Sequence, residues 1–231
     1  MTEPPASSSP SANRSVRVWD LPTRIFHWLL VVLVAFSWWS GEQGYDWMPW
    51  HFWSGYAILT LLIYRILWGF FGSGTARFSD FIKGPKAGLQ HLGALFRPGK
   101  TGDVGHNPLG GWMVALLLVL LLVQAGTGLF AEDANLNAGP LSLLVSENTS
   151  KALSDIHEMV VKFLLVAIGL HVLAVLAYLV FKRDNLVAAM FSGKKLLPIA
   201  PGSEPKMANP LLALALLVLS ALIVFAIVRL G

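Results

Sequence analysis

The chain has 231 residues, of which 55% are hydrophobic and only 13% are charged. Soluble domains carry about a quarter charged residues, so this composition excludes a disordered chain and argues against a soluble globular domain. The sequence has no cysteine, which excludes a disulfide scaffold, an iron–sulfur site, a cysteine-based zinc site and a covalently attached c-type haem. The net charge of +4 indicates nothing about partners until the charges are placed along the chain.

Residues 1–18 are rich in Pro and Ser and are predicted to form a flexible tail. A spanning helix needs about 20 mostly apolar residues, and the first of the apolar runs reaches that length only when its flanking residues are included. A cleaved signal peptide is the alternative for this first run, but Trp38 and Trp39 stand where small residues would be needed. We therefore predict an all-α integral membrane protein with five spans, built on the apolar runs Ile25–Trp39, Phe52–Phe71, Leu109–Ala131, Met159–Phe181 and Pro210–Val228.

Basic residues gather on one side of the predicted membrane. The N-terminal tail, the loop after the second run and the loop after the fourth run together hold thirteen of the 17 Lys and Arg residues. The positive-inside rule then places the N-terminus in the cytoplasm and the C-terminus outside. The outer loops Gly41–Trp50 and Glu132–Asp155 are acidic, and Trp residues fall near both ends of the spans, as in the aromatic belts of membrane proteins. The basic charge is thus a topology signal, and no nucleic-acid partner is expected.

The inner loop 72–107 is the longest connection between spans, and its segment 81–96 is expected to hold a short helix on the membrane surface. We find no internal repeat and no soluble domain. Three parts are expected: the tail 1–18, a membrane domain 19–195, and a linker with the fifth span over 196–231.

Four of the six histidines fall within or at the ends of the spans. Polar groups in hydrocarbon are costly, so each of these needs a partner or a role. His157 and His171 are 14 residues apart, which places them on nearly the same face of one helix with an axial separation of about 21 Å. His51 begins the second run at the outer side, and His27 lies near the inner end of the first. The depths predict an outer pair, His51 with His157, and an inner pair, His27 with His171.

Two imidazoles at one depth on facing helices suit a flat cofactor with two axial positions, such as haem. Two such sites across the bilayer would form a path for electrons. Three alternatives also account for histidines within the spans. Interhelical hydrogen bonding by histidine alone is the simplest. A zinc or copper cluster needs three or four ligands at one depth, and a proton relay usually adds carboxylates within the spans.

Further residues have two interpretations each. Gly55 lies one turn after His51 and gives room for a porphyrin, although small residues also serve ordinary helix packing. Arg65 is either a counter-ion for haem propionates or a side chain that extends to the inner surface. His106 precedes the third span and is either a quinone-binding residue or, as is more common, a solvated loop residue.

Several stretches resemble the bacterial cytochrome b561 and nickel–iron hydrogenase b-type cytochrome families. They are Val18–Trp28 (VWDLPTRIFHW), Gly105–Gly110 (GHNPLG), Gln124–Phe130 (QAGTGLF), and His157–His171 with the Arg183–Asn185 that follows. The resemblance covers about residues 16–195. It implies a four-helix bundle with two non-covalent b-type haems in a bacterial inner membrane, and His27, His51, His157 and His171 as axial ligands. The fifth span lies outside this four-helix core.

The resemblance also implies electron exchange between a membrane quinone pool and a partner. A periplasmic c-type cytochrome, a dehydrogenase or a hydrogenase is expected, and the acidic outer loop Glu132–Asp155 could dock it. Whether the chain is itself a quinone oxidoreductase or a subunit of one, and whether it forms a homodimer, stays open at this stage. The competing hypothesis is a haem-free membrane anchor or scaffold whose histidines only bond between helices.

Overall fold

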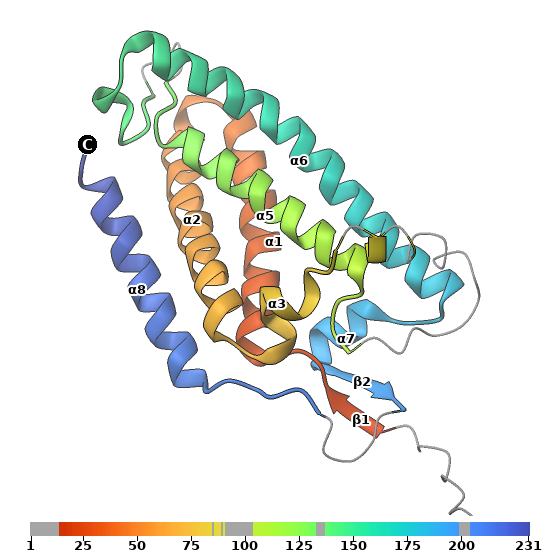
Figure 1. Cartoon of the computed structure of the whole chain (residues 1–231). Helices are drawn as coiled ribbons and strands as arrows, with labels where there is room; N and C mark the ends of the chain where they lie inside the picture. The colour runs from red at the N-terminus through yellow and green to blue at the C-terminus, as the bar shows by residue number, and fades with distance from the viewer. Residues whose placement is uncertain (1–13, 85, 89, 91–103, 133–136, 199–203) are drawn as a thin grey trace, which may run out of the picture.

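The computed structural model describes residues 14–84, 86–88, 90, 104–132, 137–198 and 204–231 (Figure 1). Helices dominate it, with one pair of short strands. The elements follow in chain order: β1 (Arg14–Arg17), α1 (Leu21–Glu42), η1 (Tyr45–Trp47), α2 (Met48–Phe71), η2 (Gly74–Ala76), α3 (Phe78–Phe81), α5 (Pro108–Gly128), η3 (Ser142–Leu144), α6 (Glu147–Phe181), α7 (Leu186–Ser192), β2 (Lys194–Leu197) and α8 (Pro210–Val228).

All five predicted runs lie in helices that are long and apolar enough to cross a membrane, namely α1, α2 with η1, α5, α6 and α8. This confirms a multi-pass membrane protein whose candidate spans are all helical. The helices differ in how much of their apolar surface the protein itself covers. Half of the most apolar stretch of α2 is buried, against less than a fifth in each of the other four helices. Helix α2 is therefore central, and the others leave most of their apolar surface for lipid.

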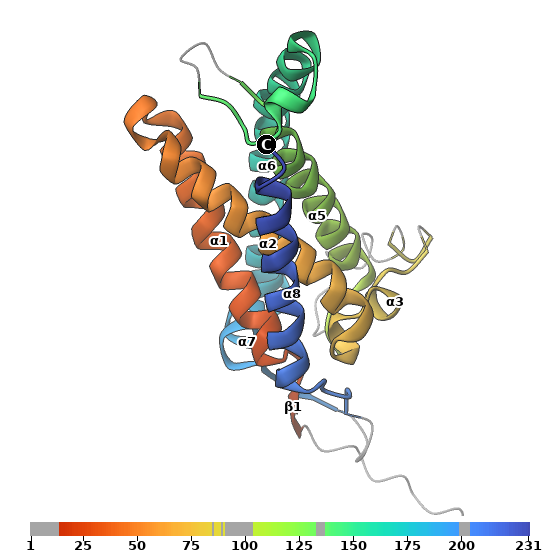
Figure 2. The ribbon, with the colours of Figure 1, turned by 90° about the vertical axis from the view of Figure 1, so that its left-hand side faces the viewer.

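The helices pack as two hairpins with α8 added. Helix α1 packs on α2 and α5 packs on α6, while α2 also contacts α5 and α8. Figure 1 shows α8 on the side of α2 away from α6, and Figure 2 shows it crossing in front of α2. We call the end of the molecule with β1, β2 and α7 the strand end, and the opposite end, where Gly231 lies, the C-terminal end. These names imply no orientation in the membrane.

The largest apolar core takes residues from all five long helices. Phe26 of α1, Leu62 of α2, Leu118 of α5, Leu164 of α6 and Ala213 of α8 are all buried in it. Four of these helices begin directly after a polar N-cap residue. The side chain of that residue accepts a hydrogen bond from a free backbone N–H in the first turn of the helix. These N-caps are Asp20, Asn107, Ser146 and Asn209 for α1, α5, α6 and α8 respectively.

Part of the predicted flexible tail is ordered. Residues Arg14–Arg17 form β1, which pairs antiparallel with β2 in the register Val16 with Lys195. Val16 and Val18 are fully buried in a small core with Trp19, Ala189 and Leu197. The prediction missed this strand because its partner lies about 180 residues away in the sequence, and two valines do not form a detectable local pattern. Residues 1–13 lie outside the described residues.

Two further boundaries differ from the sequence analysis. Helix α6 begins at Glu147 behind its Ser146 cap, so the last nine residues of the predicted outer loop Glu132–Asp155 are already part of this helix. His157 consequently lies ten residues inside a helix of 35 residues. Half of the predicted surface helix 81–96 lies outside the described residues; among those described, the structure shows helical residues at Phe81, 86–88 and 90.

Candidate functional site

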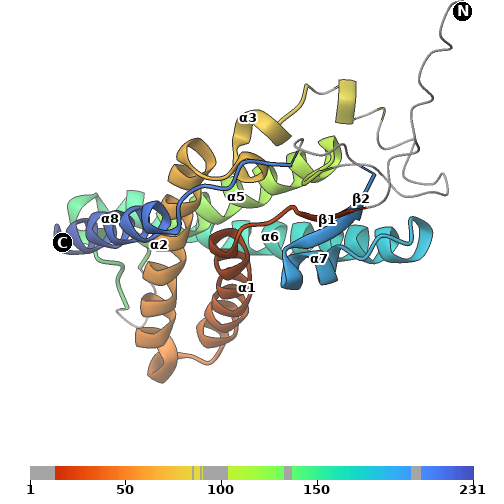
Figure 3. The same cartoon turned by 90° about the horizontal axis from the view of Figure 1, so that it is seen from below.

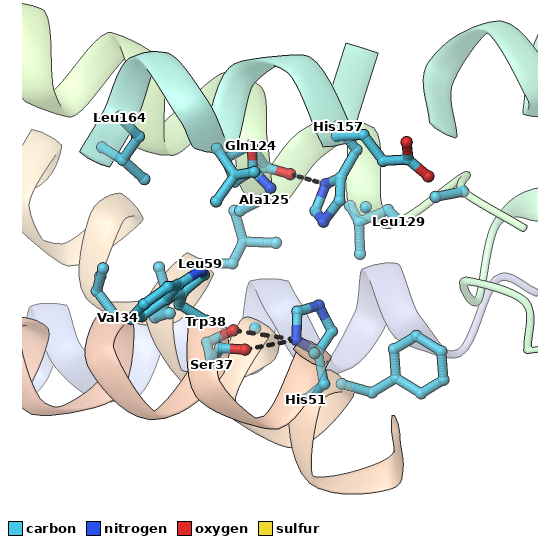
Figure 4. Close-up of a pocket in the computed structure, with 18 of the residues that line it drawn as sticks. Val34, Ser37, Trp38, His51, Leu59, Gln124, Ala125, Leu129, His157 and Leu164 are labelled. Carbon is cyan, nitrogen blue, oxygen red and sulfur yellow. Dashed lines mark hydrogen bonds between the residues drawn. The ribbon is translucent and has the colours of Figure 1, made fainter. Parts of the chain in front are cut away.

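His51 of α2 and His157 of α6 face each other near the C-terminal end (Figure 4). Their ring centroids are 6.1 Å apart, and their planes are nearly perpendicular at 81°. The two residues come from different hairpins, so their approach depends on how the hairpins pack. The pair that the sequence analysis matched by depth is therefore brought together in the folded chain.

The two rings border a cavity of about 380 Å³ between the hairpins. Its walls are mainly apolar, with Leu59 from α2, Leu129 after α5 and Leu164 from α6 among them. Gly55 also lines it, and a side chain at that position would meet no atom within 4 Å. The space beside His51 is thus open for a group that the protein itself does not supply.

Both imidazoles are fixed through the same ring nitrogen. His51 Nδ1 lies 2.8 Å from the Ser37 carbonyl oxygen, and His157 Nδ1 lies 2.9 Å from the Gln124 carbonyl oxygen. A carbonyl oxygen only accepts, so Nδ1 carries the proton and donates in both bonds. The lone pair of each ring is then on Nε2, which is the tautomer of a histidine that binds a metal through Nε2.

The residues that contact the two imidazole rings from the neighbouring helix are arranged in the same way at both histidines. On α1, the Ser40 hydroxyl also donates to the Ser37 carbonyl, and a Cβ on Gly41 would lie 3.0 Å from His51 Nδ1. On α5, the Thr127 hydroxyl donates to the Gln124 carbonyl, and a Cβ on Gly128 would lie 2.9 Å from His157 Cε1. Each ring thus rests against a glycine four residues after the carbonyl that it bonds.

These supporting residues were not found from the sequence. The only signal is a hydroxyl residue followed by glycine at the end of a span, Ser40-Gly41 and Thr127-Gly128. Such dipeptides are also common in ordinary helix packing, so they carry little information before the fold is known.

The residues at this site fit a bis-histidine haem. Two imidazoles on opposite sides of one metal ion, each with a metal–nitrogen bond of about 2 Å, have centroids roughly 6 Å apart. The rings face each other at that separation, both present Nε2, and an apolar cavity adjoins them. A structural metal cluster does not fit, because no group of three or more His, Cys, Asp or Glu residues within the described ranges could hold an ion.

A second polar cluster lies toward the strand end. It consists of His27 of α1, Arg65 of α2, His106 before α5, and His171 of α6. His106 is close to the other three, since Arg65, His171 and His27 each contribute to lowering its pKa. Nδ1 of His27 is buried and has no hydrogen-bond partner among the described residues. The predicted inner pair therefore shares its surroundings with a cation and a third histidine.

Arg65 does not extend to the surface. Its side chain is only 3% exposed, and its guanidinium carbon lies 5.1 Å from the ring centre of Phe78 and 5.7 Å from that of Phe81. One of its terminal nitrogens is buried without a hydrogen-bond partner in the described structure. A buried cation with an unused donor is suited to an anionic group, because an uncompensated charge in a low-dielectric environment is costly.

His106 is not a solvated loop residue. Its ring packs between Trp19 and Phe81, with centroid distances of 4.6 and 4.7 Å. Burial, followed by the neighbouring Arg65, His171 and His27, lowers the pKa of His106 from 6.5 to about 3. Its Nδ1 is buried and has no partner among the described residues. A neutral imidazole with a free nitrogen is available to bind a polar group of a ligand.

Sequence comparison with known proteins supports a haem-binding interpretation of this site. The sequence model described as prokaryotic cytochrome b561 matches residues 18–193, a range that holds all four span histidines. A protein of Rhizobium leguminosarum bv. viciae named "Probable Ni/Fe-hydrogenase B-type cytochrome subunit" is 28% identical over 217 residues, covering 79% of this chain and 90% of the relative. No solved structure matches the chain. With a family match over three quarters of its length, the chain belongs to the prokaryotic cytochrome b561 family.

Proposed function

We propose that this chain is a di-haem b-type cytochrome that carries electrons across the membrane between the quinone pool and a periplasmic redox partner. Membership of a b-type cytochrome family implies haem b. The observation that carries the proposal is the His51–His157 pair, with rings 6.1 Å apart and both Nδ1 atoms bonded to carbonyl oxygens. Interhelical hydrogen bonding accounts for the Nδ1 atoms, since each ring bonds the neighbouring helix of its own hairpin. It does not account for the approach of the two rings to each other from different hairpins.

His51 and His157 would hold one haem b, with the porphyrin beside Gly55. When bound by these two histidines, haem b would supply one-electron transfer. The protein contributes the orientation of the ligands: the Ser37 and Gln124 carbonyls keep both imidazoles in the binding tautomer and raise their basicity.

His27 and His171 would hold the second haem, toward the strand end. Arg65 is the residue suited to bind a haem propionate there, because it is buried and has an unused N–H donor. His106, the third histidine of this cluster, would bind a carbonyl oxygen of quinone through a ring N–H.

The distribution of charge supports the proposed orientation, and the name of the relative supports the proposed partner. The basic residues at the strand end support an orientation with that end in the cytoplasm of a bacterial inner membrane and the C-terminus in the periplasm. The relative's name supports a hydrogenase as the periplasmic partner, with another dehydrogenase or a c-type cytochrome as alternatives. A homodimer is compatible with this arrangement.

The test of the proposal is the visible spectrum of the purified protein with a determination of haem per chain. We expect sharp reduced α-bands, two haems per chain and non-covalent attachment. A folded, colourless protein would reject the proposal and favour a haem-free anchor whose histidines only bond between helices.

The pairing has its own test. His51→Ala and His157→Ala should each remove one haem and leave the other, because each deletes one of two ligands at the C-terminal end. His27→Ala should remove the other haem. Redox titration of each variant should then show a single midpoint potential, that of the remaining haem. This potential should be the same in His51→Ala and His157→Ala and different in His27→Ala. Loss of both haems in a variant that keeps its helical circular dichroism would contradict the pairing.

A further inference from the structure

A lipid-facing groove runs along α1 beside α7. From α1 it is lined by Leu21, Ile25, Leu29 and Val32, which recur every three or four residues and are between 48% and 64% exposed. Met190 and Phe191 of α7 form its other wall, where Phe191 stacks on Trp28 with centroids 4.3 Å apart. From Leu21 to Val32 the helix rises about 16 Å, which is about half of the roughly 30 Å hydrocarbon core. The groove therefore has the length of an acyl chain in one leaflet.

Three cations surround the strand end of this groove. Arg17 and Lys194 are paired opposite each other on β1 and β2, and both are exposed. Arg24, in the first turn of α1, lies beside Gly193, where an added Cβ would be 3.3 Å from the guanidinium. Gly193 directly precedes Lys194 and has a positive φ of 76°. The glycine turn thus brings Arg24 of the helix close to the basic residues of the two strands.

Nothing in the described structure neutralises these three charges. Arg24 donates through one terminal nitrogen to the Phe191 carbonyl oxygen, which ties α1 to α7, but its Nε is buried without a partner. Two carboxylates lie in this region among the described residues. Asp184 is paired with Lys195 at 2.7 Å, and the Asp20 carboxylate accepts hydrogen bonds from the Thr23 backbone N–H and the Trp68 indole N–H. Like charges directly opposite on neighbouring strands repel each other. An anion at the level where the groove meets the aqueous surface would therefore stabilise the arrangement.

We propose that the α1–α7 groove, with Arg17, Arg24 and Lys194 at its end, binds an anionic phospholipid. The phosphate would accept hydrogen bonds from the three cations, and one acyl chain would lie along the groove. A zwitterionic lipid fits less well, because its own ammonium group offsets the attraction of the cations. The proposal does not depend on the presence of haem.

The experiment is a lipid titration of the purified full-length protein in uncharged detergent, followed by native mass spectrometry. Phosphatidylglycerol and phosphatidylcholine with identical acyl chains are compared. Wild type should bind phosphatidylglycerol more than about tenfold more tightly than phosphatidylcholine. Arg17→Gln with Lys194→Gln should weaken phosphatidylglycerol binding roughly 30-fold. The two cations are expected to contribute about equally to the affinity for the anionic headgroup, so removing both multiplies the two losses.

The matched control removes the same charge elsewhere. Lys83 and Lys86 are exposed and belong to the segment after α3, which Figure 3 shows on the opposite side of the molecule from α7. Lys83→Gln with Lys86→Gln should leave phosphatidylglycerol affinity unchanged. Equal losses in the two double variants, equal affinity for the two lipids, or full competition by inorganic phosphate would each overturn the proposal. Circular dichroism confirms that the variants are folded.

Discussion

At the scale of single residues, the absence of a side chain is as important as the imidazoles. Gly128 leaves room for the His157 ring, because a Cβ there would lie 2.9 Å from Cε1 and 3.2 Å from Nδ1. The ring would have to move away from the Gln124 carbonyl that fixes its tautomer. Gly126, two residues earlier on α5, has no atom within 4 Å of the equivalent position.

Gly128→Ala should therefore lower the occupancy of the haem held by His157, with a loss of affinity of about 10- to 100-fold, as is typical when a ligand's supporting group is disturbed. Haem per chain at limiting added haem is the measurement. Gly126→Ala is the control and should behave as wild type. If the two variants lose haem equally, the contact with His157 has no role in binding.

The stability of the folded chain is expected to depend on pH through His106. Its pKa falls from 6.5 to about 3 in the folded state, chiefly through burial and then through Arg65, His171 and His27. As the pH falls below the unfolded value, the unfolded chain binds a proton that the folded chain does not, so stability decreases toward acid. Above about pH 7 both states are neutral and the effect is absent.

We expect the melting temperature of wild type to fall more between about pH 7 and about pH 4 than that of His106→Gln, which lacks this titrating group. Thermal unfolding in detergent at the two pH values measures the difference. Parallel decreases in the two proteins would show that His106 titrates normally in the folded chain.

At the scale of elements, the start of α1 is tied to α2 by one carboxylate. Asp20 accepts from the Thr23 backbone N–H at 2.6 Å and from the indole N–H of Trp68 at 3.2 Å. Trp68 is fully buried, and its N–H is also within 3.2 Å of the Thr23 hydroxyl. This contact sets the packing of the helix that carries His27 against the helix that carries Arg65.

Asp20→Ala should destabilise the protein by about 2 kcal/mol, of which about 1 comes from the helix cap and about 1 from the buried indole bond. Asn209→Ala is the matched control, because Asn209 caps α8 but is exposed; it should cost about 1 kcal/mol. Denaturant unfolding in micelles compares the two. Equal costs would mean that the bond between Asp20 and Trp68 contributes nothing.

At the scale of the whole molecule, the two hairpins place polar sites at both ends of an apolar body. The His51–His157 pair lies near the C-terminal end, and the cluster around Arg65 lies nearer the strand end. Charge asymmetry then determines which end faces the cytoplasm. Because the sequence has no cysteine, single cysteines can report this orientation without background.

Leu143 lies in η3 at the C-terminal end and is 88% exposed, and Ser79 is an exposed residue of α3 at the strand end. In spheroplasts, a membrane-impermeant maleimide should label Leu143→Cys at once, and Ser79→Cys only after the membrane is opened. The reverse pattern would place the strand end outside and contradict the proposed orientation.

The sequence by itself determined the five spans and the depth of their histidines. Hydropathy is a local property, and a spanning helix satisfies its backbone hydrogen bonds within its own segment, so neither depends on distant residues. The match of His51 with His157 by depth also followed, because helical rise converts residue number into height.

Only the tertiary structure decided what surrounds these histidines. The Ser37 and Gln124 carbonyls, the glycines behind each ring, the burial of Arg65 under Phe78 and Phe81, and the strand pair of β1 with β2 all join segments that are distant in the sequence. Such contacts are set by how packed helices rotate about their axes, and no local pattern of residue types encodes that rotation.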